Sequence, residues 1–491
     1  MSNHDVRITN SENRFRELAT KLDKVLSHFY NNINIVCNAN IHLSRNHPEY
    51  LGLWKNVLYK KNLSVNDYFN AFLILARSFL YFFISILLEF FRFSRNYRTS
   101  QPKSSEVDFI FISHQIENTV TDDDSYFGGL IEDLSKSNKR VTRLLISHIN
   151  PPKSQIKSGK YPTIFLNKSM NGSVLFKYFF LNLYSLCRLF FFCLRNHFTF
   201  YELVTLLIGQ LSNFSLVRII KQIEFELNTL KPKNLVITFE GNALEKAVFL
   251  LSKKSKIRCF GYQHVPLIQS QHAILRSINN ALDPDIILCS GPYSRDKFKT
   301  KLGKENKILI LGSPKFRRFV DKKNDTYKKQ DILLVPDGNY QSINNFIALG
   351  NYLISSNYSG NVIIRSHPLF REYLETRINH LKDIYPYRLL ISPGDLIEVL
   401  NSSKWVIYQN SSVAIQALLE GCNIIYLSNV LANIDPLWEQ SEYRSTAATF
   451  LEIKNILETF DLTKSPNPSE LHDLGRIYFS ELNLEIIRDY Q

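Results

Sequence analysis

Two acidic residues follow apolar runs that are typical of buried strands. Glu240 comes after 234–238 (NLVIT) and Asp337 after 331–336 (DILLVP), and a glycine follows each acid. A carboxylate in such a place can act as a general acid or base, with its pKa raised by partial burial, or as a nucleophile. Two non-catalytic interpretations remain open: a helix cap or ion pair for Glu240, and an Asx turn for Asp337.

A histidine follows a third apolar run. Arg365 and His367 come directly after 361–364 (NVII), and Pro368 restricts the His367 backbone to extended geometry. An imidazole and a guanidinium at a strand end can bind a phosphate. The alternative is a loop histidine whose hydrogen bonds are satisfied within the protein.

Two serines follow a fourth apolar run. Asn410, Ser411 and Ser412 come after 405–408 (WVIY) and open a predicted helix. Hydroxyl groups, free backbone N–H groups and the helix dipole at such a position favour an anion, although plain N-capping is the alternative. Ser411 lies 44 residues after His367, a spacing of one strand–helix–strand passage.

The apolar runs define the elements that must position these side chains. Strands are predicted in two series, 107–113, 141–147, 234–240, 257–263, 285–290 and 307–312, then 331–336, 361–366, 389–392, 405–408 and 423–427. Helices are predicted at 125–134, 243–252 and 342–355. This alternation predicts an α/β protein with two Rossmann-like domains that face a central cleft. Ligands in such sheets bind beyond the carboxyl ends of the strands, where the four groups lie.

The series divide the chain into four parts. We predict an N-terminal helical region (1–105), a first Rossmann-like domain with a Phe-rich helical insertion (106–320), a second Rossmann-like domain (321–448) and C-terminal helices (449–491). Polar segments at 97–105 and 317–330 are predicted linkers.

Composition narrows the partners. The 491 residues carry a net charge of +14, which suits an anionic partner, but no Lys/Arg-rich helix or aromatic RNA-binding motif indicates nucleic acid. None of the six cysteines forms a C-x-x-C pair, so metal and redox functions are disfavoured and a reducing compartment is favoured. No apolar signal segment is visible at the N-terminus, and a cytoplasmic location is expected.

Two apolar stretches, 71–93 and 174–194, allow three interpretations. They can be buried helices, helices that rest on a membrane surface, or membrane spans. Spanning is disfavoured because Arg77 and Glu89 interrupt the first stretch and two basic residues interrupt the second. A charge near the middle of a bilayer costs roughly 2.5–3.5 kcal/mol.

The His367-Pro368 and Ser411-Ser412 pairs resemble motifs of bacterial CMP-sugar transferases, namely sialyltransferases, polysialyltransferases and the Kdo transferases of capsule and O-antigen synthesis. In those families the histidine and serines hold the phosphate and cytidine of CMP. The resemblance therefore implies that Arg365, His367, Pro368, Asn410, Ser411 and Ser412 bind the nucleotide.

Other segments extend the resemblance over about residues 107–430. The stretch 239–241 (FEG) is similar to the acidic-acidic-glycine motif of these families, with Phe in place of the first acid. Asp337 falls where the bacterial β-Kdo transferases carry an acidic nucleophile. The segments 124–127 (DSYF) and 261–264 (GYQH) resemble those of surface-carbohydrate biosynthesis proteins, which makes Gln263 and His264 acceptor-side or secondary residues.

The resemblance implies a GT-B enzyme that transfers a 3-deoxy-2-ulosonic acid from CMP to a surface polysaccharide or glycolipid, as in capsule, O-antigen or lipopolysaccharide synthesis. Glu240 and Asp337 are its expected catalytic residues, and Gly312 and Ser313 at the domain junction are expected near the nucleotide. No metal or cofactor is expected, because the acidic run 122–124 is placed in a solvated loop. The protein is expected at the inner membrane surface.

Three alternatives to this function stay open. A polyol-phosphate transferase that uses CDP-glycerol also carries a histidine-proline signature. A degenerate GT-B scaffold without catalysis can serve polysaccharide assembly. Nucleic-acid binding is permitted by charge alone.

Overall fold

The computed structural model describes most of the chain. The described residues are 3–42, 53–59, 62–93, 107–115, 124–147, 160–166, 170–265, 267, 274–303, 307–314, 316, 331–356, 358–367, 370–379, 389–392, 396–428, 435–459 and 468–488. Both predicted linkers, Pro368, Asp122 and Asp123 lie outside the described residues.

A seven-stranded parallel sheet forms the centre of the first α/β domain, with strand order β3-β2-β1-β4-β5-β6-β7. The strands are β1 (Phe109–Gln115), β2 (Val141–Ser147), β3 (Thr163–Phe165), β4 (Asn234–Thr238), β5 (Arg258–Gln263), β6 (Ile286–Cys289) and β7 (Ile308–Ile310). Central strands such as β4 are buried along their whole length, which explains their continuous apolar sequence.

Besides the helical insertion between β3 and β4, three described helices connect strands of this sheet: α6 (Leu130–Lys136), α10 (Ala243–Lys254) and α11 (Pro292–Leu302). Helix α6 begins five residues later than the sequence predicts. The Asp124 carboxylate accepts the backbone N–H groups of Tyr126 and Phe127 at 2.9 and 3.1 Å, and this turn replaces the first helical residues.

A six-stranded parallel sheet forms the second α/β domain, with strand order β10-β9-β8-β11-β12-β13. The strands are β8 (Asp331–Val335), β9 (Val362–Ile364), β10 (Leu389–Ile391), β11 (Ser403–Tyr408), β12 (Asn423–Leu427) and β13 (Arg444–Ala447). The helices are α13 (Tyr340–Ser355), α14 (Arg371–Asn379), α15 (Leu396–Ser402), α16 (Val413–Leu419) and α17 (Phe450–Thr459), and the 3-10 segment η6 (Trp438–Tyr443) precedes β13.

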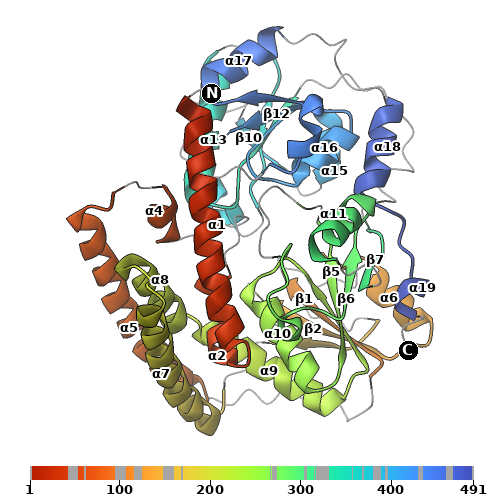
Figure 1. Cartoon of the computed structure of the whole chain (residues 1–491). Helices are drawn as coiled ribbons and strands as arrows, with labels where there is room; N and C mark the ends of the chain where they lie inside the picture. Colours follow the sequence, from red (N-terminus) through yellow and green to blue (C-terminus); the bar gives the residue numbers. More distant parts are fainter. Residues whose placement is uncertain are drawn as a thin grey trace.

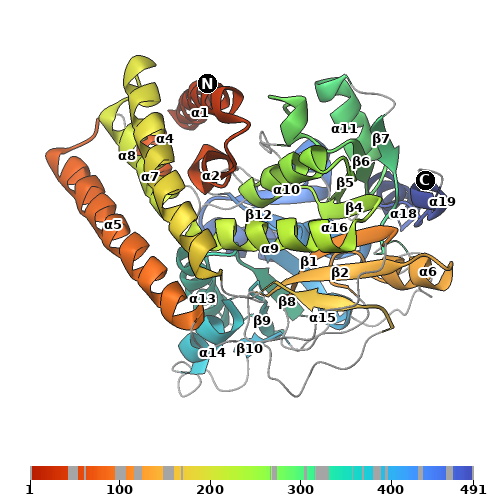
Figure 2. The ribbon, with the colours of Figure 1, turned by 90° about the horizontal axis from the view of Figure 1, so that it is seen from below.

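The N-terminal helices and the Phe-rich insertion pack into one helical unit. Its elements are α1 (Asn3–Phe29), α2 (Ile33–Val36), η1 (Ala39–Ile41), α4 (Trp54–Tyr59), α5 (Val65–Phe93), α7 (Gly172–Arg195), α8 (Phe200–Leu211) and α9 (Phe214–Leu230). Buried hydrogen bonds join the two parts, for example from Gln210 Nε2 and Asn213 Nδ2 to the Asn34 carbonyl oxygen. Helices α5, α7 and α8 stand at one side of the molecule, with α5 outermost (Figures 1 and 2).

The C-terminal segment returns to the first domain. Helix α18 (Pro468–Tyr478) ends beside β6, and α19 (Glu485–Arg488) follows. The Ser480 N–H donates to the Ser290 carbonyl at 2.8 Å, and the Ser313 N–H donates to the Ser480 carbonyl at 2.9 Å. Gly475 of α18 lies against Leu419 of α16, so the segment bridges the two domains.

The residues that follow β6 and β7 therefore lie at the junction between the domains. Lys297 of α11 also forms an ion pair with Glu439 of η6, which follows β12 in the second domain. The two Rossmann-like domains with an added helical region give the GT-B architecture that the sequence predicts (Figure 1).

Two described helices are long and apolar enough to cross a membrane, 65–91 of α5 and 172–195 of α7, and a third candidate arises if α8 and α9, bent by 47°, count as one span. Only 11% of the apolar window of α5 and 28% of that of α7 is buried. The interpretation of these stretches as buried core helices is wrong.

Candidate functional site

The β8–α13 loop of the second domain holds the Asp337 carboxylate, which is 8% exposed. Its Oδ1 accepts the N–H of the next residue, Gly338, at 2.8 Å, whereas an Asx turn would use the N–H two residues on, which donates to the Asp337 carbonyl oxygen instead. Its Oδ2 accepts the side-chain amides of Asn339 at 3.1 Å and of Asn410 at 3.2 Å. The bond to Asn410, from the loop after β11, brings together two groups that lie 73 residues apart in the sequence.

A second layer of polar side chains fixes this loop. Ser342 accepts the Asp337 N–H at 2.9 Å and donates to Gln409 Oε1 at 2.7 Å. The Asn339 side chain caps α13 through the Ser342 N–H at 2.8 Å. The Asp337 N–H is thus held by Ser342 of α13, whose hydroxyl is fixed in turn by Gln409 in the loop after β11.

The β9–α14 loop brings the predicted phosphate ligands beside Asp337. Arg365 is half-buried and its Nη1 donates to Ser392 Oγ, at the end of β10, at 2.9 Å. His367 is exposed. A Cβ built on Gly338 would lie 3.8 Å from the His367 Cβ, so the β8 and β9 loops are neighbours. Ser392 was not predicted, because its contact with Arg365 depends on the pairing of β10 with β9.

The β11–α16 loop carries Asn410, Ser411 and Ser412, all half-buried. Asn410 has a φ of +52°, a left-handed conformation that asparagine tolerates, and its Oδ1 is buried without a partner among the described residues. Helix α16 has only seven residues, so its dipole favours an anion less than a longer helix would. Any anion bound here depends on the hydroxyls and on Arg365 and His367.

The first domain presents a second polar group after β4 and β5. His264 Nε2 lies 3.8 Å from Glu240 Oε1, and the side chains are 10% and 32% exposed. The Tyr126 ring packs edge-on against His264 with 4.8 Å between ring centroids. Gln263 is 2% exposed, and its Oε1 has no hydrogen-bond partner in the described structure.

Glu245 shapes the loop that carries Glu240. Its carboxylate accepts the backbone N–H groups of Glu240, Gly241 and Asn242 at 2.6 to 3.1 Å, and the Asn242 side chain caps α10 in return. Burial, reinforced by the Glu240 charge, raises the pKa of Glu245 to about 8. Sequence reasoning missed this residue, although Asn242 followed by Glu245 three residues later is a capping-box signature.

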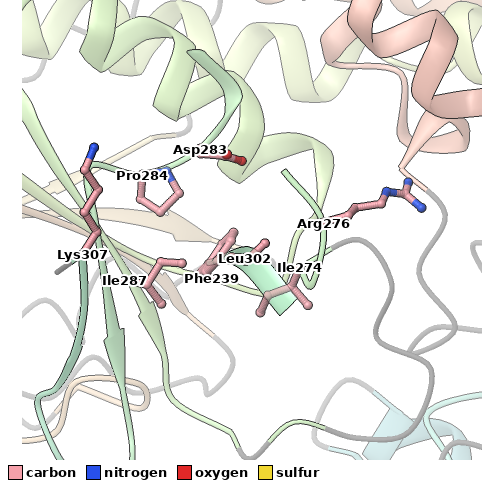
Figure 3. Close-up of a pocket in the computed structure, with 8 residues that line it drawn as sticks. All are labelled: Phe239, Ile274, Arg276, Asp283, Pro284, Ile287, Leu302 and Lys307. Carbon is pink, nitrogen blue, oxygen red and sulfur yellow. The ribbon is translucent and has the colours of Figure 1, made fainter. Parts of the chain in front are cut away.

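The Phe at position 239 has a structural reason. Its side chain is 2% exposed and stacks on Phe298 of α11 at 6.0 Å between centroids. Phe239 also lines a small cavity with seven other side chains, drawn in Figure 3 (Ile274, Arg276, Asp283, Pro284, Ile287, Leu302 and Lys307). Position 239 belongs to the core, and an acid there would be buried.

Two of the three charged side chains that line that cavity form ion pairs. Asp283 contacts Lys246 at 3.3 Å, and Arg276 contacts Asp23 of α1 at 2.9 Å. The cavity is therefore part of the packing between α1, α10 and the sheet rather than a ligand site.

Asp124 is buried, which contradicts the prediction of a solvated loop for this residue. It is 6% exposed, accepts the Ser113 hydroxyl at 2.8 Å and pairs with buried Arg143 at 3.3 Å. The pair holds the turn that presents Tyr126 to His264. Asp124 therefore has a positioning role.

Gly312 and Ser313 contact the C-terminal segment. The Gly312 carbonyl accepts the Tyr262 hydroxyl at 2.9 Å, and a Cβ on Gly312 would lie 2.1 Å from the Glu481 carbonyl oxygen. This packing accounts for the glycine, whose φ is +90°. No described contact tests the prediction that Gly312 and Ser313 lie near the nucleotide.

The predicted site residues thus form two groups. Asp337, Arg365, His367, Asn410, Ser411 and Ser412 lie at the carboxyl edge of the second sheet, and Glu240, Gln263 and His264 at that of the first. Within the described ranges, no three or more His, Cys, Asp or Glu side chains gather in a way that could hold a metal ion.

Comparison with known proteins gives similarity in fold only. No protein-family model matches the chain, and no curated protein sequence matches it. The structure is similar to that of S. aureus MnaA with UDP (11% identity, TM-score 0.49, 78% of this chain and 95% of that one). It is also similar to a UDP-N-acetylglucosamine 2-epimerase from Listeria monocytogenes (11%, 0.47, 78% and 95%) and to the lipopolysaccharide galactosyltransferase WaaB (12%, 0.40, 78% and 98%). All three TM-scores are below 0.5.

Proposed function

We propose that the protein is a glycosyltransferase that moves a 3-deoxy-2-ulosonic acid, of the Kdo or sialic type, from a CMP donor to a polysaccharide or glycolipid acceptor. The observation that carries the proposal is the Asp337–Asn410 contact of 3.2 Å. It joins a carboxylate to the loop of Ser411 and Ser412, beside Arg365 and His367, at the sheet edge where nucleotides bind in such folds. The six cysteines are all free, which agrees with a reducing, cytoplasmic location.

The second domain supplies the donor site in this proposal. The Arg365 guanidinium, the His367 imidazole and the hydroxyls of Ser411 and Ser412 bind the CMP phosphate. Neutralising its charge makes CMP a good leaving group without a metal ion. When the bond between the anomeric carbon and the phosphate oxygen breaks, the electron pair passes to CMP.

The first domain supplies the acceptor side. Glu240 takes the proton of the acceptor hydroxyl as its oxygen attacks the anomeric carbon. His264, 3.8 Å from Glu240, orients that carboxylate, and Tyr126 orients His264. In a single displacement this step inverts the anomeric centre.

Asp337 permits a second route. Its carboxylate can attack the anomeric carbon first, release CMP and form a glycosyl ester. The acceptor oxygen then displaces Asp337 while Glu240 takes the proton, and the configuration is retained. Both routes use Glu240 as the proton acceptor, and only the second uses the Asp337 carboxylate as a nucleophile.

A nucleotide panel tests the donor. The chain is heated with CMP, CDP-glycerol or UDP, and a nucleotide that binds only the folded state raises Tm. CMP is expected to raise Tm the most. In a second assay, the protein is expected to hydrolyse CMP-Kdo or CMP-sialic acid. UDP is included because the similar S. aureus structure contains it. A shift only with CDP-glycerol would favour polyol-phosphate transfer, and no shift with any nucleotide would favour a scaffold.

The variant His367→Ala tests whether CMP binds at the proposed donor site. The side chain is exposed, so the variant should fold normally, while the donor KM rises about tenfold or more. Exposed His197, on the turn after α7, provides the matched control as His197→Ala. A donor KM unchanged by His367→Ala would remove this histidine from the CMP site.

A further inference from the structure

An apolar surface covers the outer side of α5 and α7, which we call the α5–α7 face. In the described structure, fourteen exposed large hydrophobic side chains lie on α5 and seven on α7, against seven on all other elements. The α5 members are Val65, Tyr68, Phe69, Phe72, Leu73, Ile74, Leu80, Tyr81, Phe83, Ile84, Leu87, Leu88, Phe90 and Phe91. Exposed contiguous apolar area on this scale marks an interaction surface.

The width of the face indicates the kind of partner. Phe72, Leu73 and Ile74 are consecutive and all exposed, and they point in directions about 100° apart around the helix. A partner helix or groove covers a stripe with residues three or four apart. Lipid chains can cover side chains that extend over about 200° of the α5 circumference more readily than a second protein surface can.

The inner side of α5 is fixed to the protein. Ala71 packs against Tyr201 of α8, and Phe82 stacks on Phe179 of α7 at 5.8 Å. Glu89, one of the charges that interrupts the stretch, is 1% exposed, accepts the Met170 N–H at 2.7 Å and pairs with Arg218 at 3.4 Å. Folding thus removes this acid from the outer face.

The remaining charges suit an anionic lipid surface. Arg77 is the exposed charge among the described side chains of α5, where it bonds the Tyr81 hydroxyl at 2.9 Å. Lys177 is exposed on α7. With a net charge of +14, the chain repels a second copy of itself and is attracted to anionic headgroups.

Arg77 also distinguishes lying from spanning. It is the thirteenth of the 29 residues of α5, a helix about 43 Å long. A spanning α5 would place this charge at the bilayer centre, which is unfavourable. A helix that lies in the interface lets the Arg77 head reach the headgroups while its stem stays in the apolar layer.

We infer that the α5–α7 face is a membrane-anchoring surface, on which α5 and α7 lie within one leaflet of an anionic bilayer. The inference rests on the helical unit and goes beyond the proposed transfer reaction. With this anchoring, the same side of the molecule always faces the lipid.

Vesicle flotation of the full chain tests this inference. Binding to phosphatidylcholine vesicles with about a third phosphatidylglycerol is expected, and weaker binding to phosphatidylcholine alone. The variant Leu73→Ser/Leu80→Ser/Leu87→Ser should lose at least tenfold in partitioning. The control Phe225→Ser/Leu390→Ser/Leu451→Ser, at exposed apolar positions elsewhere, should bind like the parent chain.

Two measurements keep the flotation result interpretable. Circular dichroism and Tm establish that each variant is folded, and the Tm shift with CMP reports the donor site separately. Unchanged flotation of the folded α5 variant would overturn the inference. So would a parent chain that forms a dimer by light scattering, ignores vesicles and becomes monomeric in the α5 variant.

Depth measurement tests the lying orientation. Phe69, Leu80 and Leu87 are exposed and lie on one line along α5, and each is replaced in turn by Trp. Nitroxide lipids labelled near the headgroup should quench all three equally, and lipids labelled at the chain end should quench them weakly. Deepest quenching at Leu80→Trp would indicate a span and overturn the proposed orientation.

Discussion

Asp337 and Glu240 are both carboxylates at strand ends, but their surroundings differ. Asp337 is 8% exposed and accepts three hydrogen bonds from Gly338, Asn339 and Asn410. Glu240 has a side chain that is 32% exposed and lies near His264. The first group is held in one orientation, as a nucleophile requires, and the second can meet a proton donor from solvent or substrate.

Replacing Asp337 by Asn should separate its chemical role from its structural one. The variant turns an amide N–H₂ toward the amides of Asn339 and Asn410, so stability should fall by about 1–3 kcal/mol. If Asp337 is the nucleophile, transfer falls at least 10³-fold while the Tm shift with CMP persists. Asn410→Ala, at the predicted nucleotide site, shows how much activity depends on one donor to the carboxylate. Transfer by Asp337→Asn at the rate of the parent chain would exclude Asp337 as the nucleophile.

Glu240→Gln addresses the acid–base role. The side chain is partly exposed, so the fold should be retained, while transfer falls about 10²–10⁴-fold. The acidic limb of the pH–rate profile, along which the rate rises as Glu240 loses its proton, should flatten because the proton acceptor is gone. Activity measured from pH 5 to 9 checks this, and an unaltered profile would assign the proton transfer elsewhere.

At the residue level, the sequence predicted which residues lie at strand ends better than it predicted the side chains that contact them. Glu240, Asp337, His367 and Ser411 were found because buried strands of a parallel sheet are continuous apolar runs whose ends are easily seen. Ser392 and Tyr126 were missed because their contacts depend on strand order and on a turn. Neither is encoded in a local pattern.

At the level of elements, the β4–α10 connection depends on one buried carboxyl group. Glu245 satisfies three backbone N–H groups that would otherwise be left unpaired at the start of α10. The same group has a pKa raised to about 8 by burial and by Glu240. The position of Glu240 is therefore linked to the protonation of Glu245.

This linkage predicts a pH-dependent stability. The folded state keeps the Glu245 proton up to about pH 8, whereas the unfolded chain releases it near 4.5. Between these values the folded state binds more protons, so stability falls as pH rises, by at most about 1.4 kcal/mol per pH unit. Urea unfolding at pH 5, 6, 7 and 8 measures the slope. Glu245→Gln should remove it, and an identical slope in the variant would contradict the assignment.

The two strands that sequence missed share a physical cause. β3 has three residues, all half-buried, and β13 reads RSTA, with no apolar run to mark it. Both are edge strands, each paired with a neighbour on one side only. The opposite error occurred for α5 and α7, whose apolar composition also fits a core helix, so that only the fold shows which side is covered.

At the level of the whole molecule, the C-terminal segment closes the first domain. Gly312 meets the Glu481 carbonyl so closely that no side chain fits, and its φ is +90°. Ser480 and Asn483 donate to backbone carbonyls of the first domain. The stability of that domain should depend on residues that follow the second one.

Gly312→Ala should therefore loosen the C-terminal segment. Gly303→Ala is the control, since its φ is also positive, +62°, but its Cβ would meet open space. The control should cost about 1 kcal/mol and Gly312→Ala at least twice that. Hydrogen exchange at the Ser480 and Asn483 amides should be faster only in Gly312→Ala. Equal rates of amide exchange in both variants would mean that the C-terminal segment accommodates the added methyl group without a loss of stability.

The same closure has a consequence for synthesis on the ribosome. Ser313 and its partner Ser480 are 167 residues apart, and the second domain lies between them. At about 5–20 residues per second, roughly ten to thirty seconds pass between the appearance of the two. During that interval the β6–β7 edge of the nascent first domain is open, and chaperones have their best access to it.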